Sequence, residues 1–104
     1  MKEAINTVTL EQAQTWVAAW GEKSNIDIKA FLIPEIDITQ VLNEDGVENV
    51  RAYLGIDENG TPKMMVVGVD KYGQDMINDD QGFYIYDFTK PCPEKCDFTS
   101  PLMK

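Results

Sequence analysis

The sequence predicts a two-layer α+β fold, in which a small antiparallel sheet built on a central hairpin at about residues 48–70 is packed by an N-terminal amphipathic helix. Two observations lead to this prediction. Apolar residues recur at helical spacing near the N-terminus, and two strand-like runs flank Asn59-Gly60. No linker, repeat or low-complexity tract interrupts the 104 residues, a length typical of one domain. We therefore expect residues 1–104 to form a single α+β domain.

The first predicted element is an amphipathic helix over residues 10–20. The hydroxyl of Thr9 can cap its free amides, and Gln12 follows three residues later, as in a capping box. Gly21 stands where a C-terminal cap is expected. We expect the two tryptophans of this helix to pack against the sheet, with a ligand-binding role for the pair as the alternative. The apolar stripe consists of Leu10, Ala13, Trp16, Val17 and Trp20.

Two shorter elements are predicted next. Apolar and polar residues alternate at the start of residues 26–33, and the segment then becomes apolar on both faces before Pro34. This pattern predicts a strand entering a sheet. Asp37 and Gln40 repeat the capping pattern ahead of a short apolar stripe that stops before Gly46. This pattern predicts a short helix of about two turns.

The central hairpin is predicted from Asn59-Gly60, the preferred pair for a two-residue type I′ turn. That turn places Ala52 opposite Val67 and Arg51 opposite Gly68. One face of the hairpin is then apolar and is expected to lie beneath the tryptophan-bearing helix. The apolar face comprises Val50, Ala52, Leu54, Val67 and Val69.

The C-terminal third contributes one more predicted strand. Residues 71–74 indicate a turn, and residues 75–82 indicate a polar loop. Residues 83–88 are rich in aromatic side chains and predict the last strand, with Tyr84 and Tyr86 on one side of it. Three prolines from Pro91 onward predict an irregular cover over part of the sheet.

The charge balance excludes several classes of function. The chain has 18 acidic residues, 9 basic residues and no histidine, for a net charge of -9. A surface this acidic repels phosphate, so nucleic acid is not expected as a partner. Without histidine there is no Ser-His or Cys-His catalytic pair and no histidine ligand for a metal. Since nucleotide-binding and nucleophile motifs are missing too, we expect no catalytic residue and no cofactor, and a non-enzymatic role is favoured.

No segment predicts a membrane or targeting role. The longest mainly apolar run, residues 64–69, is far shorter than the ~20 residues that a membrane-spanning helix needs. The N-terminus lacks the apolar core of a signal peptide. We therefore expect a cytoplasmic protein without a membrane partner.

Cys92 and Cys96 form the most chemically suggestive pair. Three residues separate them, whereas thioredoxin-like motifs have two. Two thiols without histidine are too few ligands for structural zinc, and no metal site is expected. Two interpretations stay open. The cysteines are either structural, reduced or disulfide-bonded, or a redox pair in which Lys95 lowers a thiol pKa.

Arg51 is the best candidate for a polar group on a binding face. Tyr53, with Tyr84 or Tyr86, is predicted on the same sheet surface. An arginine flanked by aromatic rings can bind the carboxylate or phosphate of a small anionic ligand. The alternative is that the guanidinium stacks on its neighbours and pairs with a loop aspartate such as Asp75.

Acidic residues gather in two stretches. The loop that holds Asp70, Asp75, Asp79 and Asp80 matches no EF-hand spacing and is interpreted as a solvated acidic loop. Residues 35–48 contain five acids and no base. Two of these acids lie near a predicted helix N-terminus, where the dipole favours negative charge and no function is needed to explain them. The alternative is a surface that docks a basic protein partner, including one that mimics the charge of nucleic acid. The other expected partner is a second copy of the chain, held through an exposed strand edge or through the acidic face.

Three segments resemble a group of short, uncharacterised bacterial proteins. They are residues 46–55, residues 64–70 with their Val-Gly-Val-Asp end together with Gly73 and Asp75, and Pro91-Cys92-Pro93 with Cys96. The resemblance covers roughly the second half of the chain and implies no activity. It implies that Arg51, the strand end and the two cysteines belong to one recurring arrangement.

These observations predict a small, acidic, cytosolic binding or protein-interaction module without enzymatic activity. One alternative is a thiol-redox protein that uses Cys92 and Cys96. The other is a binder of small anionic ligands that uses Arg51.

Overall fold

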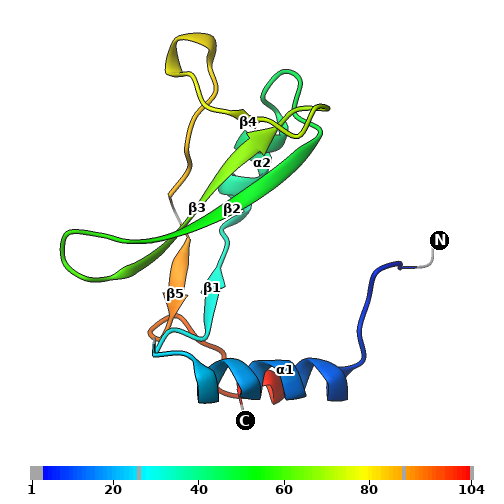
Figure 1. Cartoon of the computed structure of the whole chain (residues 1–104), viewed down its shortest axis with the longest axis vertical. Coiled ribbons are helices and arrows are strands. Elements are labelled where there is room, and N and C mark those ends of the chain that lie inside the picture. Colours follow the sequence, from blue (N-terminus) through cyan, green and yellow to red (C-terminus); the bar gives the residue numbers. More distant parts are fainter. Residues whose placement is uncertain (1–3, 26, 88, 104) are drawn as a thin grey trace.

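The computed structural model describes residues 4–25, 27–87 and 89–103 and has the predicted α+β class (Figure 1). Within these residues, one antiparallel sheet joins β1 to β5 and a second has the strand order β2-β3-β4. The elements in chain order are α1 (Leu10–Lys23), β1 (Ala30–Leu32), α2 (Glu35–Leu42), β2 (Asn49–Ile56), β3 (Pro62–Val69), β4 (Asp75–Met76), the 3-10 turn η1 (Asp79–Gln81), β5 (Lys90–Cys92) and the 3-10 turn η2 (Pro101–Met103).

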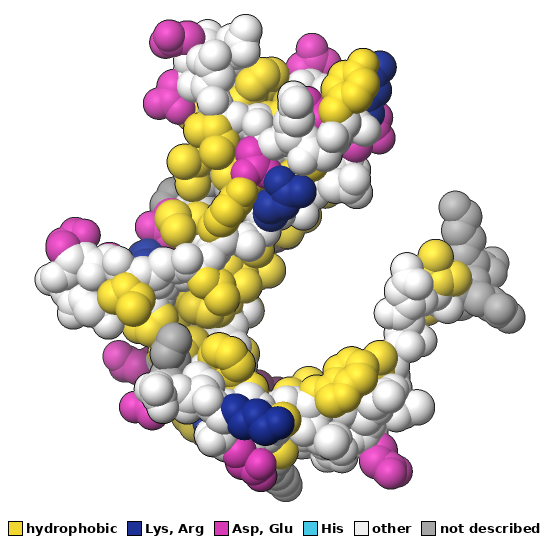
Figure 2. All heavy atoms as spheres, in the orientation of Figure 1, with side chains coloured by type: hydrophobic (Ala, Val, Ile, Leu, Met, Phe, Trp, Pro, Cys, Tyr) yellow, Lys and Arg dark blue, Asp and Glu magenta, His cyan; other side chains and the backbone are white. Residues whose placement is uncertain are grey.

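The molecule is open in shape. Figure 1 shows α1 on one side and the β2-β3 hairpin on the other, joined through β1 and β5, and Figure 2 shows a wide bay between them. The radius of gyration is 15.8 Å, against about 13 Å for a compact domain of this length. The accessible surface is 8168 Å², whereas a compact monomer of this mass exposes about 5,900 Å². The chain therefore exposes about 2,300 Å² more than a compact monomer would.

Helix α1 begins as predicted but ends later. The hydroxyl oxygen of Thr9 accepts a hydrogen bond from the backbone N–H of Gln12 at 3.1 Å. Gly21 lies inside the helix, which ends where the N–H of Ser24 donates to the carbonyl of Trp20 at 2.9 Å. The predicted cap at Gly21 is therefore wrong, because a glycine within a helix costs only about 1 kcal/mol and needs no left-handed turn there.

Helix α1 lies against η2 and faces the hairpin only across the bay. The side-chain amide of Gln14 donates to the carbonyl of Pro101 at 3.1 Å, which fixes this contact. No residue of α1 is buried, so its apolar stripe stays accessible. None of the helices in the described part of the chain is long and apolar enough to cross a membrane.

Helix α2 begins two residues before the predicted cap. Pro34 precedes its first residue, with φ of -61°, a value already suited to a helix start. Asp37 is therefore inside the first turn and fully buried, and its prediction as the N-cap is wrong. Negative charge in a first turn is favoured by the helix dipole.

The loop between β2 and β3 is longer than the predicted two-residue turn. The N–H of Gly60 donates to the carbonyl of Asp57, and the N–H of Asp57 donates to the carbonyl of Thr61, both at 3.0 Å. The Oδ1 atom of Asp57 accepts from the N–H groups of Asn59 and Thr61 at 2.9 Å each. A type I′ turn needs positive φ at both central residues, but here only Gly60, at 80°, has it. The predicted type I′ turn is therefore wrong.

The turn predicted at residues 71–74 is confirmed, and it repeats the same chemistry. The N–H of Gly73 donates to the carbonyl of Asp70 at 3.0 Å. The Oδ1 atom of Asp70 accepts from the N–H groups of Tyr72 and Gln74 at 2.9 and 3.0 Å. Both hairpin loops therefore depend on an aspartate placed three residues before a glycine.

The longer first loop shifts the hairpin register by one residue. Arg51 lies opposite Val67, and Ala52 lies opposite Val66, so the predicted pairing of Ala52 with Val67 is wrong. Residues directly opposite each other share a face of the sheet. The Leu54 face contains Val50, Ala52, Leu54, Ile56, Pro62, Met64, Val66 and Gly68. The Arg51 face contains Asn49, Arg51, Tyr53, Gly55, Lys63, Met65, Val67 and Val69.

Burial in this sheet follows strand position instead of face. The central strand β3 is buried on both faces from Val66 to Val69. The edge strand β2 is exposed, with Leu54 and Ile56 at 67% and 68%. The prediction of one buried apolar face is therefore wrong. The residues that β2 was expected to contribute to that face are exposed, and those from β3 belong to the Arg51 face.

The core lies where α2 crosses β3. Val41 of α2 is fully buried, together with Val66 and Val67. Gly68 permits the close approach, because a Cβ at that position would lie 2.5 Å from Cγ2 of Val47. The remaining buried apolar side chains are Val69, Met76 and Cys92.

The C-terminal third differs most from the prediction. In place of a strand over residues 83–88, Phe83 and Tyr86 each form an isolated bridge, to Asn78 and to Val66, while Phe88 lies outside the described residues. The stretch predicted as irregular contains β5, which pairs with β1. Its proline is compatible with an edge strand. Strand β1 itself is shorter than the predicted 26–33, and Ile26 is outside the described residues.

Candidate functional site

Arg51 is held by an internal cluster on the Arg51 face. Its Nη1 atom pairs with Asp75, whose other carboxylate oxygen accepts from the hydroxyl of Tyr53. Its Nη2 atom donates to the carbonyl of Gly73 at 3.4 Å. Strand β4 places the carboxylate there, because Asp75 lies opposite Val69 on the same face. The hydrogen bond to Asp75 is the main cause that raises the pKa of both Arg51 and Tyr53.

Tyr84 and Tyr86 lie apart from this cluster. Tyr86 bridges Val66 and therefore belongs to the Leu54 face, so the prediction that it shares a surface with Arg51 is wrong. Its hydroxyl donates to Oε2 of Glu44 at 2.6 Å, and the N–H of Tyr84 donates to the same atom at 3.1 Å. Burial, and then the Glu44 hydrogen bond, raise the pKa of Tyr86 to about 12. The rings of Tyr84 and Tyr86 pack edge to face, with their centroids 6.3 Å apart.

The four predicted ligand-binding residues therefore form two separate polar networks. Arg51 adopts the alternative that the sequence left open, a pair with Asp75. Asp75 and Gly73 each accept from one terminal nitrogen of Arg51, and the paired carboxylate offsets the positive charge that would attract an anion. A ligand site at Arg51, Tyr53, Tyr84 and Tyr86 stays a prediction.

Cys92 and Cys96 are joined by a disulfide. Cys92 is buried, lies opposite Ala30 in the β1-β5 sheet, and has Sγ 3.9 Å from Sδ of Met103. The bond therefore fixes the tail where it leaves β5. This geometry suits a structural role, and the redox interpretation stays a prediction.

Acidic side chains in the described ranges do not gather into a cation site. No group of three or more cysteines and carboxylates there is arranged to hold a metal ion. Several loop acids have local roles instead: Asp57, Asp70 and Asp97 each accept backbone N–H bonds. The hydroxyl and the backbone N–H of Thr99 both donate hydrogen bonds to Asp97, and these bonds lower the pKa of its carboxyl group.

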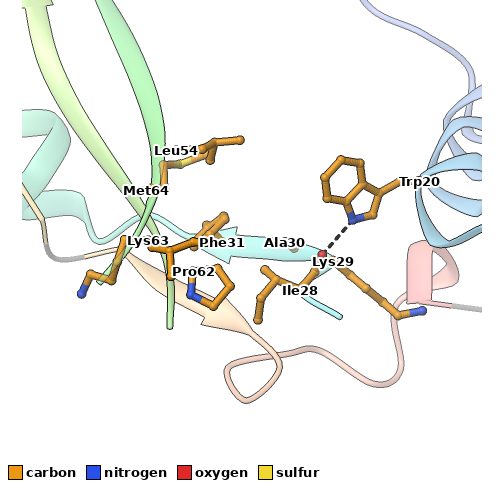
Figure 3. Close-up of a pocket in the computed structure, with 11 residues that line it drawn as sticks. Trp20, Ile28, Lys29, Ala30, Phe31, Leu54, Pro62, Lys63 and Met64 are labelled. Carbon is orange, nitrogen blue, oxygen red and sulfur yellow. Dashed lines mark hydrogen bonds between the residues drawn. The ribbon is translucent and has the colours of Figure 1, made fainter. Parts of the chain in front are cut away.

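The most distinctive surface feature is an apolar hollow of about 560 Å³ at the hairpin end of the bay (Figure 3). It falls between the end of α1, the start of β1 and the hairpin. Its volume lies within the range of about 300–1,000 Å³ that is usual for ligand pockets. Its main apolar lining side chains are Trp20, Ile28, Phe31, Leu54, Ile56 and Met64.

Trp20 forms one wall of the hollow. Its indole Nε1 donates to the carbonyl of Ile28 at 2.7 Å, which leaves the ring directed toward the hairpin, as Figure 3 shows. Leu54 and Met64 stand on the opposite wall in the same view. The expectation that the tryptophan pair packs against the sheet is not met, because Trp16 and Trp20 remain 56% and 43% exposed.

The charged side chains around the hollow lie at its rim. They are Lys29 and Lys63, and their ammonium groups extend outward in Figure 3. Lys63 also pairs with Asp87 at 3.3 Å. The indole N–H is already bonded to Ile28, so the interior of the hollow offers apolar side chains and very few free polar groups.

Sequence reasoning missed this hollow. The available signal was the apolar face of β2 itself, where Val50, Ala52, Leu54 and Ile56 recur at every second position and nothing in the sequence shows what covers them. The one-residue error in register assigned Leu54 to a buried face, which hid the signal.

No protein-family model, no curated protein and no solved structure matches the chain. The interpretation of the site therefore depends on its geometry alone, and the resemblance to uncharacterised bacterial proteins stays a prediction.

Proposed function

We propose that this protein is a non-enzymatic protein-interaction module whose binding surface is the hollow together with the exposed strand β2. The observation that carries the proposal is the exposure of large apolar side chains on both. Single exposed apolar residues are ordinary on protein surfaces, but a contiguous group marks an interaction site. In Figure 2 such side chains line the bay along the hairpin and along α1.

A protein partner suits this surface better than a small metabolite does. Small-molecule sites combine apolar walls with a few polar groups that fix the ligand's orientation. Here the indole N–H is bonded to Ile28 and Arg51 is bonded to Asp75, so few such groups are free. The apolar side chains of a protein partner need only a complementary apolar surface to pack against, and the exposed side chains of Leu54 and Ile56 supply one.

We further propose the cytoplasm as the compartment and, for the exposed acids Glu35, Asp45 and Glu48, a basic protein as a second kind of partner. The net charge of -9 supports the latter, because opposite charge speeds protein association. Cellular thiols keep most cytoplasmic cysteines reduced, so this compartment requires that the Cys92–Cys96 disulfide resists reduction, as structural disulfides with potentials below about −300 mV do. Cell fractionation followed by immunoblotting tests the compartment directly. Recovery of the protein outside the cytoplasmic fraction would contradict the assignment.

The proposed surface can be tested by photo-crosslinking in cells. A photo-reactive residue such as p-benzoylphenylalanine replaces Leu54, and a matched variant carries it at Ile77, which is half exposed and lies outside the hollow. We expect protein adducts from position 54, whether to another protein or to a second copy, and far fewer from position 77. Equal or absent adducts at position 54 would refute the proposed binding surface.

A further inference from the structure

We infer that the partner of β2 is a second copy of this chain, paired edge to edge and antiparallel, so that the two β2-β3-β4 sheets join into one. This inference rests on the proposed function and names the occupant of its surface. It begins from the strand order, in which β2 is an edge and pairs with β3 alone among the described strands.

The alternation of backbone hydrogen bonds along the hairpin shows which N–H and C=O groups of β2 point away from β3. Asp57 bonds through its N–H to Thr61, the residue opposite it, so the odd residues of β2 direct their backbone groups toward β3. The bonds between Val66 and Tyr86, both at 2.9 Å, confirm this alternation, since the even residues of β3 bond away from β2. The even residues of β2 therefore direct N–H and C=O toward the open edge. These are Val50, Ala52, Leu54 and Ile56.

The edge lacks most of the features by which natural proteins protect an open strand. Such edges usually carry a charged side chain, above all lysine, or a proline or a bulge, or are very short. Strand β2 is 8 residues long, contains neither proline nor lysine, and pairs with β3 without a bulge. Its one charged side chain, Arg51, is paired with Asp75 of its own chain. It also exposes apolar side chains on both faces, among them Leu54 and Tyr53. An unprotected edge of this kind is a template for another strand.

The exposed surface is large enough for an occupant of the size of a second copy. The excess of about 2,300 Å² per chain amounts to about 4,600 Å² for two chains, and obligate homodimers bury about 2,000–5,000 Å². A twofold interface must also be self-complementary, with the same patch on both subunits. An antiparallel β2 pair satisfies this requirement, because each strand offers alternating donors and acceptors to the other.

Symmetry then selects a register. A twofold axis through Tyr53 lets all four outward-facing residues of each strand bond, with Val50 opposite Ile56 of the second copy and Ala52 opposite Leu54 of the second copy. Tyr53 then faces itself in a non-hydrogen-bonded pair, where Cα atoms stand about 4.5 Å apart. That distance is within the range of about 4.4–6.8 Å that a disulfide spans.

Two substitutions test this register. Tyr53→Cys is expected to form an interchain disulfide under mild oxidation, located by peptide mass mapping beside the native Cys92–Cys96 bond. Arg51→Cys is the matched control on the same face of β2. It would lie four residues, roughly 13 Å, from its counterpart, too far to link. Linkage of both variants, or of neither, would overturn the register.

Ala52→Pro tests the edge itself. The N–H of Ala52 points to the open edge, so proline removes one central intermolecular bond from each strand, two in the twofold pair, and leaves the bonds to β3 intact. Light scattering should give about twice 11.8 kDa for the parent chain and for the control Ala52→Val. The dimer dissociation constant of Ala52→Pro should rise roughly 100-fold. Circular dichroism of all three checks that each variant folds.

The outcomes separate this inference from the proposed function. A monomer that still gives adducts to other proteins at position 54 overturns the second copy but supports the binding surface. A dimer insensitive to Ala52→Pro overturns the inference, because another surface must hold it. A monomer without adducts at position 54 overturns both.

Discussion

Trp20 and Ile28 are joined by a hydrogen bond of 2.7 Å from the indole N–H to the main-chain carbonyl. The bond ties the C-terminal end of α1 to the segment that leads into β1. It holds the tryptophan ring as one wall of the hollow, even though no residue of α1 is buried. A single polar contact thus sets the position of an apolar surface.

Trp20→Phe should therefore destabilise the protein by about 1 kcal/mol, since it removes one hydrogen bond and keeps an aromatic ring. For a domain of this size, thermal unfolding should move down by roughly 4–8 °C. Trp16→Phe is the control, because the indole of Trp16 makes no hydrogen bond among the described residues. Equal shifts for both variants would show that the bond to Ile28 contributes nothing.

Gly68→Ala should destabilise the protein by about 1–3 kcal/mol, because the added methyl group overpacks the contact of β3 with the segment between α2 and β2. The new Cβ would lie 2.5 Å from Cγ2 of Val47. Gly21→Ala is the matched control, since a Cβ there meets nothing within 4 Å. It should stabilise α1 by roughly 0.8–1.0 kcal/mol through helix propensity. Urea unfolding measures both, and a neutral Gly68→Ala would contradict the packing described here.

Alkaline pH should weaken the fold through Tyr86. Its folded pKa of about 12 lies above the ordinary value of 10.0, so the folded state holds the phenolic proton more tightly than the unfolded state does. The stabilisation is complete below pH 10 and is lost as the pH rises from 10 toward 12.

Tyr86→Phe should flatten this part of the pH dependence of unfolding, while lowering stability at neutral pH through loss of the bond to Glu44. Tyr72→Phe, at an exposed tyrosine in the Asp70 loop, is the control and should leave the parent profile unchanged. Identical alkaline profiles for the parent chain and Tyr86→Phe would rule out the assignment to Tyr86.

Reduction of the Cys92–Cys96 bond should lower the free energy of unfolding by about 2 kcal/mol, the loop-closure entropy of a five-residue ring. Thermal unfolding with and without dithiothreitol measures the change, and the variant with both cysteines replaced by alanine should match the reduced protein. The same samples give the midpoint potential. A potential below about −300 mV is that of a structural disulfide, whereas a value near those of cellular redox proteins supports the alternative of a thiol-redox protein.

Local patterns in the sequence were sufficient for the α+β class, for the start of α1 at Thr9 and for the turn at residues 71–74. Each of these depends on contacts within a few residues, such as the Thr9 hydroxyl with the Gln12 amide. The apolar stripe of α1 was also evident, but the surface that it faces was not. A stripe shows that a helix has an apolar side and does not identify what lies opposite.

The register of the hairpin was decided between two local turns, and the candidate site by tertiary structure. Asn59-Gly60 favours a two-residue turn, yet Asp57 captures two amide groups of the loop and leaves Gly60 as the one loop residue with positive φ, which slips β3 by one residue. That slip reassigned Arg51 to a cluster with Asp75 and left Leu54 on the open bay. Strand order then determined burial, because β3 is covered from both sides whereas β2 has a neighbour on one side only. A single sequence does not show which of two local turns wins, because their energies are close. The position of a strand within a sheet depends on contacts between distant residues, which a single sequence does not display either.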